Sequence, residues 1–151
     1  MKNLDKIKIF ADGADLENIK ELNLNPFISG FTTNPSLMKK AGVEDYERFS
    51  KDVLKIISKK PISFEIFSDD IKEMYKQAKK IASWGENVYV KIPVINSKGI
   101  FMGKIIKELN RKNIKLNITA VYNAHQTKKI VKFLNKKTKV IISIFAGRAG
   151  D

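Results

Sequence analysis

Residues 87–94 read NVYVKIPV and place one lysine, Lys91, inside an otherwise almost wholly apolar run. Burial disfavours the ammonium form of a lysine, and the neutral amine is a nucleophile. Toward a carbonyl compound such an amine forms a Schiff base, an electron sink that lets a neighbouring C–C bond break or form. Lys91 also has two non-catalytic interpretations: an ion pair with Glu65, or a side chain that reaches past the end of its strand.

Two carboxylates occupy comparable positions on other apolar runs. Schiff-base chemistry requires proton transfers, so acids or bases are needed beside the lysine. Glu65 lies between Phe64 and Ile66, where an unpaired carboxylate is costly. Asp12 comes late in the run KIKIFAD, although FADGAD is also compatible with a simple turn. We therefore expect Asp12 and Glu65 to face Lys91.

Six apolar, β-branched-rich runs of strand length must position these groups. They cover residues 6–12, 28–33, 61–67, 87–92, 115–121 and 139–145. Helix-period stretches lie between them, most clearly at 44–58 and 70–83. We expect Asp15 and Asn123 to be N-caps, and Gly85 to end a helix in the left-handed conformation. Strict strand–helix alternation predicts right-handed βαβ units and a parallel sheet.

The position of the polar residues decides between an open doubly wound sheet and a barrel. A (β/α)8 barrel collects its chemistry at the C-terminal ends of its strands. Polar groups come late in each run: Asp12, Thr33, Asn34, Glu65, Lys91, Asn117, Thr119 and Ser143. A nucleotide-binding open sheet is expected to carry a glycine-rich first turn, and DGADLEN has no G-x-G-x-x-G. We predict an α/β fold, a (β/α)8 TIM barrel.

The number of strands is smaller than a complete barrel requires. A barrel has eight strands in about 250 residues, with about 200 as the lower end. The chain has 151 residues, and its sixth run is followed directly by AGRAGD. We therefore expect residues 1–151 to form a single barrel domain whose C-terminal part is missing, as in a fragment or a truncated product.

The formal net charge of +13 raises the question of a polyanionic partner. Lysines are spread along the whole chain and never form an uninterrupted block of five or six, so we predict a solvated basic surface that steers anionic metabolites. Residues 128–139 lack acids and are the best remaining nucleic-acid candidate. We expect neither a nucleic-acid nor a membrane partner.

Several other classes are excluded by simple counts. The chain has no cysteine, which excludes disulfides and thiolate chemistry, and one histidine, His125, which excludes a histidine-rich metal site. The N-terminus lacks the apolar centre of a signal peptide, and no apolar run approaches the length of a membrane span. We expect a cytoplasmic protein.

Six short segments together resemble one family. FADGAD, GFTTNPS, SFEIF, VKIPV, LNITAVY and SIFAGR are similar, in order, to the corresponding segments of the transaldolase family, including its short-chain branch with the fructose-6-phosphate aldolases. Each segment alone is unspecific, but six in register, one per strand end, are a specific match. The resemblance implies a barrel of class I aldolase type and a Schiff base on Lys91, without a metal or another cofactor.

The same resemblance implies roles for individual residues. Asp12 is similar to the aspartate that exchanges the proton of the substrate hydroxyl. Glu65 and Thr119 are similar to the pair that holds a catalytic water. The implied substrate-binding residues are Thr33, Asn34, Asn117, Ser143, Phe145 and Arg148. Arg148 matches the residue that grips the sugar phosphate, a task that suits a bidentate donor.

Two positions favour transfer over simple cleavage. Glu65 and Phe145 follow the transaldolase pattern, whereas the aldolases carry glutamine and tyrosine there. Gly13 departs from the threonine or serine that is common after the first aspartate. The implied reaction belongs to the pentose phosphate pathway and converts sedoheptulose 7-phosphate and glyceraldehyde 3-phosphate to erythrose 4-phosphate and fructose 6-phosphate.

Two alternatives to this function remain open. One is a fructose-6-phosphate aldolase, and the other is a non-catalytic, truncated basic binding module. For a full-length relative of this branch we also expect assembly into a homo-oligomer.

Overall fold

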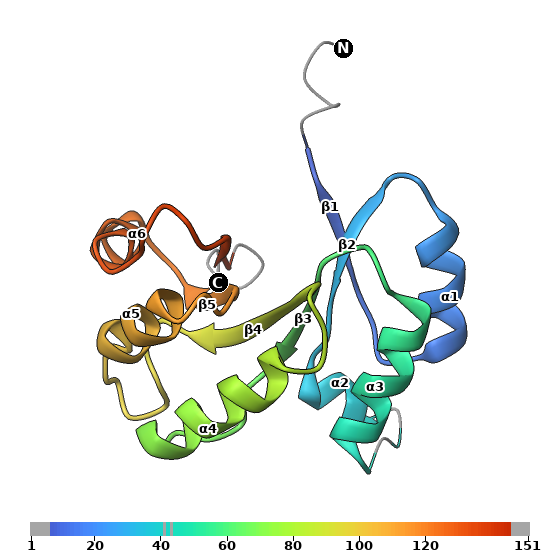
Figure 1. Ribbon diagram of the computed structural model, residues 1–151, viewed down its shortest axis with the longest axis horizontal. Helices are drawn as coiled ribbons and strands as arrows, with labels where there is room; N and C mark the ends of the chain where they lie inside the picture. Colours follow the sequence, from blue (N-terminus) through green and yellow to red (C-terminus); the bar gives the residue numbers. More distant parts are fainter. Residues whose placement is uncertain (1–6, 41, 43, 146–151) are drawn as a thin grey trace. The chain divides into compact units, whose positions relative to one another are not determined.

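The computed structural model describes residues 7–145 except positions 41 and 43. In chain order its elements are β1 (Ile9–Asp12), α1 (Leu16–Leu24), β2 (Ile28–Thr32), α2 (Pro35–Lys40), α3 (Tyr46–Ile56), β3 (Ile62–Glu65), α4 (Ile71–Ala82), β4 (Val88–Pro93), α5 (Gly103–Arg111), β5 (Leu116–Val121), α6 (Ala124–Val131) and β6 (Val140–Ile144) (Figure 1). Each predicted run corresponds to one strand. Five strands lie within their predicted runs, and β4 ends one residue beyond its run, at Pro93. The two predicted helical stretches are α3 and α4.

The strand order of the sheet is the chain order, β1-β2-β3-β4-β5-β6. The pairs β1–β2, β2–β3, β4–β5 and β5–β6 are parallel. A doubly wound sheet reverses its strand order at a switch point, and this sheet does not. In general, successive right-handed crossovers that advance in one direction place their helices on one face of the strands. This is the topology of a (β/α)8 barrel with six of its βα units, as predicted.

The chain divides into two compact units. The N-terminal unit comprises the described residues of Met1–Phe64 with Trp84–Val88. The C-terminal unit comprises those of Glu65–Ser83 with Tyr89–Asp151. A single domain over residues 1–151 stays a prediction.

In the N-terminal unit, strand β2 passes very close to its neighbours at Gly30. A Cβ atom at this position would lie 2.3 Å from the Phe10 ring and 2.8 Å from the carbonyl oxygen of Pro61. Glycine is therefore required because the backbone itself fills the space where a side chain would go. Beside β3, the rings of Tyr46, Phe64 and Trp84 pack on one another with centroids 5.6 to 6.3 Å apart.

In the C-terminal unit, the strand face that packs against helices is wholly aliphatic. Its fully buried residues are Val90, Ile92, Leu116 and Ile118. The fully buried helix residues of the same core are Met74 and Ala78 from α4 and Ile106 and Leu109 from α5. Strand residues two apart share a face, so the side chains at alternate positions point away from this core. The polar residues of β4 and β5 occupy those alternate positions.

The predicted N-caps are confirmed. Asp15 Oδ1 accepts a 2.8 Å hydrogen bond from the Asn18 amide at the start of α1. Asn123 caps α6 through a 2.9 Å bond from the Gln126 amide, and Gln126 Oε1 accepts the Asn123 amide in return, which completes a capping box.

The prediction for Gly85 is wrong. The left-handed glycines of the described chain are Gly42 and Gly99. Helix α4 ends instead at Ser83, a right-handed C-cap whose N–H reaches the carbonyls of Lys79 and Lys80 at 3.2 Å each. These 3₁₀-type and α-type hydrogen bonds satisfy carbonyl groups of the last helical turn, so no left-handed residue is needed to do so.

All helices of the described chain are short, and the longest, α4, has 12 residues. A helix needs about 20 apolar residues to cross a bilayer. Within the described residues no helix is long and apolar enough to do so.

Candidate active site

The polar face of the C-terminal unit is built by strand alternation. Tyr89, Lys91 and Pro93 share one face of β4, while Val90 and Ile92 are fully buried on the other. In a (β/α)8 barrel the strand face opposite the helices points into the barrel, and its residues near the C-terminal strand ends line the site. The sequence of β4 therefore directs Lys91 to this face.

Lys91 and Glu65 form the central contact of this face. The Nζ atom of Lys91 lies 3.5 Å from Oε2 of Glu65, and their side chains are 15% and 28% exposed. The backbones are joined as well, since the Ile66 amide donates a 3.1 Å hydrogen bond to the Lys91 carbonyl. The predicted approach of Glu65 to Lys91 is thus present. The geometry suits both an ion pair and proton exchange between the two groups.

Asn117 continues the face onto β5. Its Cα is paired in register with that of Lys91, and the residue is 5% exposed. Its side-chain oxygen accepts a 2.7 Å hydrogen bond from the Ser143 hydroxyl on β6. Three neighbouring strands therefore contribute a lysine, an amide and a hydroxyl to one surface.

The end of β5 departs from regular strand geometry directly after Thr119. Ala120 has a φ of 55°, in the left-handed region, and the pairing between β5 and β6 shifts register between Ile118 and Val121. Thr119 itself is half-buried and keeps regular pairing with Pro93 on β4. Thr119 therefore remains in register with β4, on the same strand face as Asn117, and the irregular backbone begins at Ala120.

Phe145 follows the last strand, β6. Its amide donates a 2.8 Å hydrogen bond to the Val121 carbonyl, and its side chain is 39% exposed. The ring lies beside that of Tyr122, with centroids 5.8 Å apart. An aromatic pair thus borders the C-terminal end of these two strands.

Three predicted site residues belong to the N-terminal unit. Asp12 is exposed at the end of β1 and is paired in register with Thr32. Thr33 is 1% exposed, and its hydroxyl donates to the Ser63 carbonyl at 3.0 Å. Asn34 precedes α2, and its side-chain oxygen accepts the Ser36 amide at 2.8 Å. Arg148 lies outside the described residues.

Tyr89 was missed by the sequence reasoning. It lies two residues before Lys91, hence on the same strand face, and it is 8% exposed. Burial raises the pKa of its phenol, so the group stays neutral through a wider pH range. Its i, i+2 spacing from Lys91 predicts the shared face, but Tyr89 lies near the start of β4, away from the C-terminal strand ends.

Comparison with known proteins identifies the family of the chain. A family model described as Transaldolase/Fructose-6-phosphate aldolase matches residues 9–151. A protein of Methanococcus vannielii named "Probable transaldolase" is 37% identical over 145 residues, which are 96% of this chain and 63% of the relative. Proteins with the same name from Dehalococcoides mccartyi and Bdellovibrio bacteriovorus are 36% and 34% identical over 80% and 96% of this chain.

The lengths of these relatives differ from that of this chain. The chain spans 63% of the Methanococcus vannielii and Bdellovibrio bacteriovorus relatives and 54% of the Dehalococcoides mccartyi relative. Because the family match runs from β1 to the last residue, it covers every described strand. The chain belongs to the transaldolase/fructose-6-phosphate aldolase family.

Proposed function

We propose that the chain carries the machinery of a transaldolase, with Lys91 as its Schiff-base residue. The reaction would move a dihydroxyacetone unit from sedoheptulose 7-phosphate to glyceraldehyde 3-phosphate and release erythrose 4-phosphate and fructose 6-phosphate. The observation that carries this proposal is the 3.5 Å approach of Lys91 Nζ to Glu65 Oε2, with the lysine side chain only 15% exposed. The names of the relatives support the same reaction class.

The first covalent step uses the contact between Lys91 and Glu65. The carboxylate takes a proton from the ammonium, directly or through one water, and the resulting amine attacks the ketone carbon of the sugar. The carbinolamine then loses its hydroxyl as water, and Glu65 returns the proton. By resemblance, Thr119 holds that water together with Glu65. The product is an iminium ion at Lys91.

The iminium ion makes the C–C cleavage possible. A base removes the proton from the hydroxyl group on the second carbon from the iminium carbon. The bond between this hydroxyl-bearing carbon and the carbon next to the iminium then breaks, and its electron pair converts the iminium to an enamine. An aldose phosphate leaves, and the enamine adds to the acceptor aldehyde by the reverse steps. We assign the base to Asp12 from the sequence resemblance.

Hydrogen-bonding groups around Lys91 would hold the three-carbon unit. Asn117 and Ser143 lie on the same face and offer an amide and a hydroxyl. Thr33, Asn34 and Arg148 are assigned to the substrate by resemblance, with Arg148 on the phosphate. The proposed chemistry uses no metal and no cofactor.

Borohydride trapping tests this proposal on the 151-residue chain. Reduction in the presence of fructose 6-phosphate should fix one sugar adduct to the protein, and peptide mass mapping should place it on Lys91. The adduct should vanish in Lys91→Ala and persist in Lys107→Ala, a control lysine that is exposed on α5. An adduct spread evenly over surface lysines would count against the proposal.

Two further assays separate the alternatives. A fructose-6-phosphate aldolase would make fructose 6-phosphate from free dihydroxyacetone and glyceraldehyde 3-phosphate, whereas a transaldolase should make little. A basic binding module would give no adduct and salt-dependent retention on nucleic acid.

A further inference from the structure

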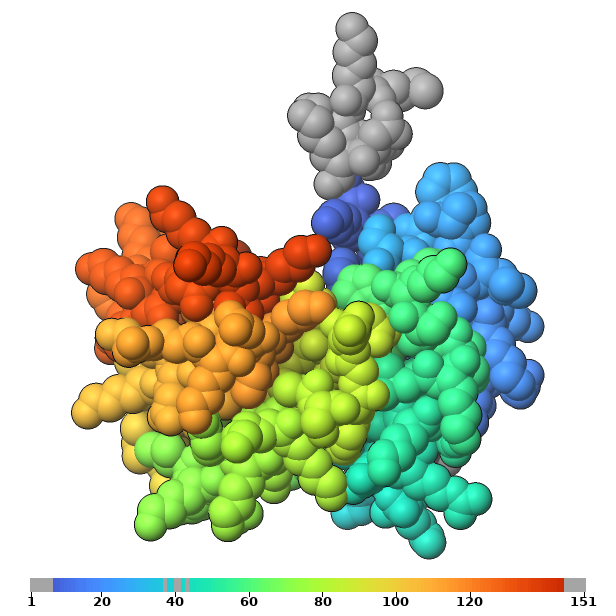
Figure 2. All heavy atoms as spheres, viewed as in Figure 1, coloured from blue at the N-terminus to red at the C-terminus, as the bar shows by residue number. Residues whose placement is uncertain are grey.

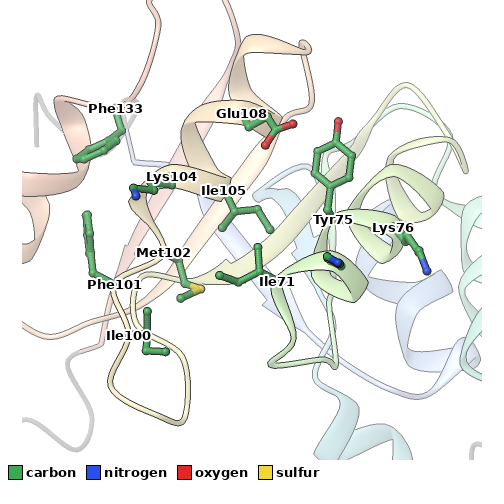
Figure 3. Close-up of a pocket in the computed structure, with 11 residues that line it drawn as sticks. Ile71, Tyr75, Lys76, Ile100, Phe101, Met102, Lys104, Ile105, Glu108 and Phe133 are labelled. Carbon is green, nitrogen blue, oxygen red and sulfur yellow. The ribbon is translucent and has the colours of Figure 1, made fainter.

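A cavity lies in the C-terminal unit, on the side of the helices. It has a volume of about 810 Å³ and opens between α4, α5 and residues 100–102 (Figure 3). None of the polar strand residues described above lines it. We call it the α4–α5 cavity. Pockets of roughly 300–1,000 Å³ with mainly apolar walls are typical of small-molecule sites.

The walls of the α4–α5 cavity are apolar and partly open to solvent. Ile71 and Ile100 are 51% and 49% exposed. Ile71 lies three and seven residues before the buried Met74 and Ala78, so it is the exposed N-terminal end of the same apolar stripe of α4. The space-filling view shows α4 and α5 on the same exposed face of the C-terminal unit (Figure 2). An apolar ligand would cover this stripe.

Aromatic rings border the α4–α5 cavity at both ends. Phe101 and Phe133 pack edge to face, with centroids 5.5 Å apart and an interplanar angle of 68°. Tyr75 lies at the opposite end, away from these two rings (Figure 3). Flat aromatic side chains offer stacking surfaces to a flat ligand.

The charges around the Phe101 end are positive. Lys104 lines the cavity beside Phe101 and Phe133 (Figure 3). Lys129 places its Nζ 4.1 Å from the centroid of the Phe101 ring. Neither lysine is ion-paired with a carboxylate of the described residues. Two ammonium groups at the edge of an apolar surface complement an anion that has an apolar body.

Part of the remaining charge around the α4–α5 cavity is compensated. Lys76 is paired with Glu73, with 2.7 Å between Nζ and Oε1. The pKa of Lys112 is raised mainly by its hydrogen bond with the Tyr75 hydroxyl, and the carboxylate of the lining residue Glu108 adds a smaller effect. Lys72 also lines the cavity and, like Lys104 and Lys129, is not ion-paired with a carboxylate of the described residues, so positive charge predominates around the cavity.

We propose that the α4–α5 cavity binds a small organic anion with a flat apolar body. The body would lie on Ile71, Met102 and Ile105, with its edge against Phe101. The anionic group, a carboxylate, sulfonate or phosphate, would lie near Lys104 and Lys129. This site is independent of the chemistry at Lys91.

Methionine methyl NMR with 2-naphthoate as the probe tests the proposal. Met102 lines the α4–α5 cavity, while Met38, buried in the N-terminal unit, serves as an internal control. We expect 2-naphthoate to shift the Met102 methyl signal saturably and to leave that of Met38 unchanged. The uncharged analogue 2-naphthylmethanol should bind about three- to tenfold more weakly, because it lacks the charge that faces the two lysines.

A matched pair of charge reversals completes the test. Lys104→Glu should weaken 2-naphthoate binding about three- to tenfold, whereas Lys107→Glu, on the same helix but outside the cavity lining, should leave it unchanged. Absence of a saturable Met102 shift, or equal effects of both variants, would overturn the proposal. A Met102 signal that depends on protein concentration without ligand, with dimers in sedimentation, would assign the cavity to a second copy of the chain and also overturn it.

Discussion

The Ser143 hydroxyl donates a 2.7 Å hydrogen bond to the side-chain oxygen of Asn117, and this bond supports the strand next to Lys91. Asn117 is paired in register with Lys91 and is 5% exposed. A buried amide that has a defined acceptor bond is held in one orientation. Ser143 therefore helps to determine which atoms the Asn117 amide presents beside Lys91.

Ser143→Ala should weaken both the fold and the chemistry. Removing the donor from a buried acceptor is expected to lower the free energy of unfolding by about 1–2 kcal/mol, as measured by urea denaturation. The rate of borohydride-trapped adduct formation on Lys91 should fall several-fold, since the Asn117 side-chain oxygen loses the hydrogen bond from Ser143. Ser143→Thr keeps the hydroxyl and should restore both values. Unchanged stability and rate in Ser143→Ala would contradict this role.

Gly30→Ala should destabilise the N-terminal unit. Its new Cβ would lie 2.3 Å from the Phe10 ring and 2.8 Å from the Pro61 carbonyl oxygen, so either the backbone or the ring must move. Overpacking of this kind is expected to lower the free energy of unfolding by about 1–3 kcal/mol, observable through the fluorescence of Trp84. Trp84 is a suitable reporter because it belongs to the same unit.

Gly13→Ala is the matched control for Gly30→Ala. The nearest atom to a Cβ at Gly13 is a side-chain carbon of Ile19 at 3.6 Å, an ordinary contact distance. Alanine there restricts the unfolded chain and should leave stability unchanged or raise it by up to about 1 kcal/mol. Equal losses in the two variants would show that the close approach at Gly30 is unimportant.

The strands, the N-caps and the polar face could be predicted because their signals are local. Alternation along β4 alone places Val90 and Ile92 on one face and Lys91 on the other. Asp15 and Asn123 are caps because their short polar side chains reach backbone amides three residues later. Local chemistry of this kind needs no knowledge of the tertiary structure.

The remaining features depend on contacts between distant segments. The left-handed Ala120 carries no glycine signal, and its conformation follows from how β5 pairs with β6. The α4–α5 cavity arises where two helices and a loop meet, which no single periodicity reveals. The sequence also leaves open whether Lys91 is a nucleophile or a structural ion-pair partner, since both interpretations require the observed contact with Glu65.

The Asp69 carboxyl should titrate below the usual range of aspartate. The Ser97 hydroxyl and the Ser97 amide both donate to it, the amide at 3.3 Å, and these bonds lower its pKa. A depressed folded-state pKa stabilises the protein above the pKa of the unfolded state, and this contribution is lost as the pH falls through the folded-state pKa. The hydrogen bonds between Asp69, before α4, and Ser97, after β4, should therefore stabilise the fold less in acid.

Carboxyl-carbon NMR titration measures this effect directly. In Ser97→Ala the Asp69 midpoint should rise, because the main donor to the carboxylate is gone. Ser68→Ala removes a hydroxyl that accepts the Asp70 amide instead, so the Asp69 midpoint should stay where it is. An Asp69 midpoint that is insensitive to Ser97→Ala would contradict the assigned cause.

Phe145→Tyr should shift the proposed reaction from transfer toward cleavage. Phe145 directly follows β6 and is 39% exposed, so a phenolic hydroxyl can be added there without filling a closed core. A phenol can donate a proton or orient water toward the enamine, which releases dihydroxyacetone before an acceptor arrives. With fructose 6-phosphate as donor, free dihydroxyacetone should rise about tenfold or more relative to transferred product, as quantified by chromatography.

Tyr122→Phe is the control for this shift, because the Tyr122 ring already lies 5.8 Å from that of Phe145. If the Tyr122 hydroxyl released dihydroxyacetone, its removal would lower the release in the parent chain. We expect no change, since the side chain is 54% exposed and is therefore mostly hydrated rather than directed at the enamine. A normal Lys91 adduct with an unchanged product ratio in Phe145→Tyr would refute the role of position 145 alone. Loss of the adduct in the unsubstituted chain would instead refute the Schiff-base proposal, so the two failures are distinguishable.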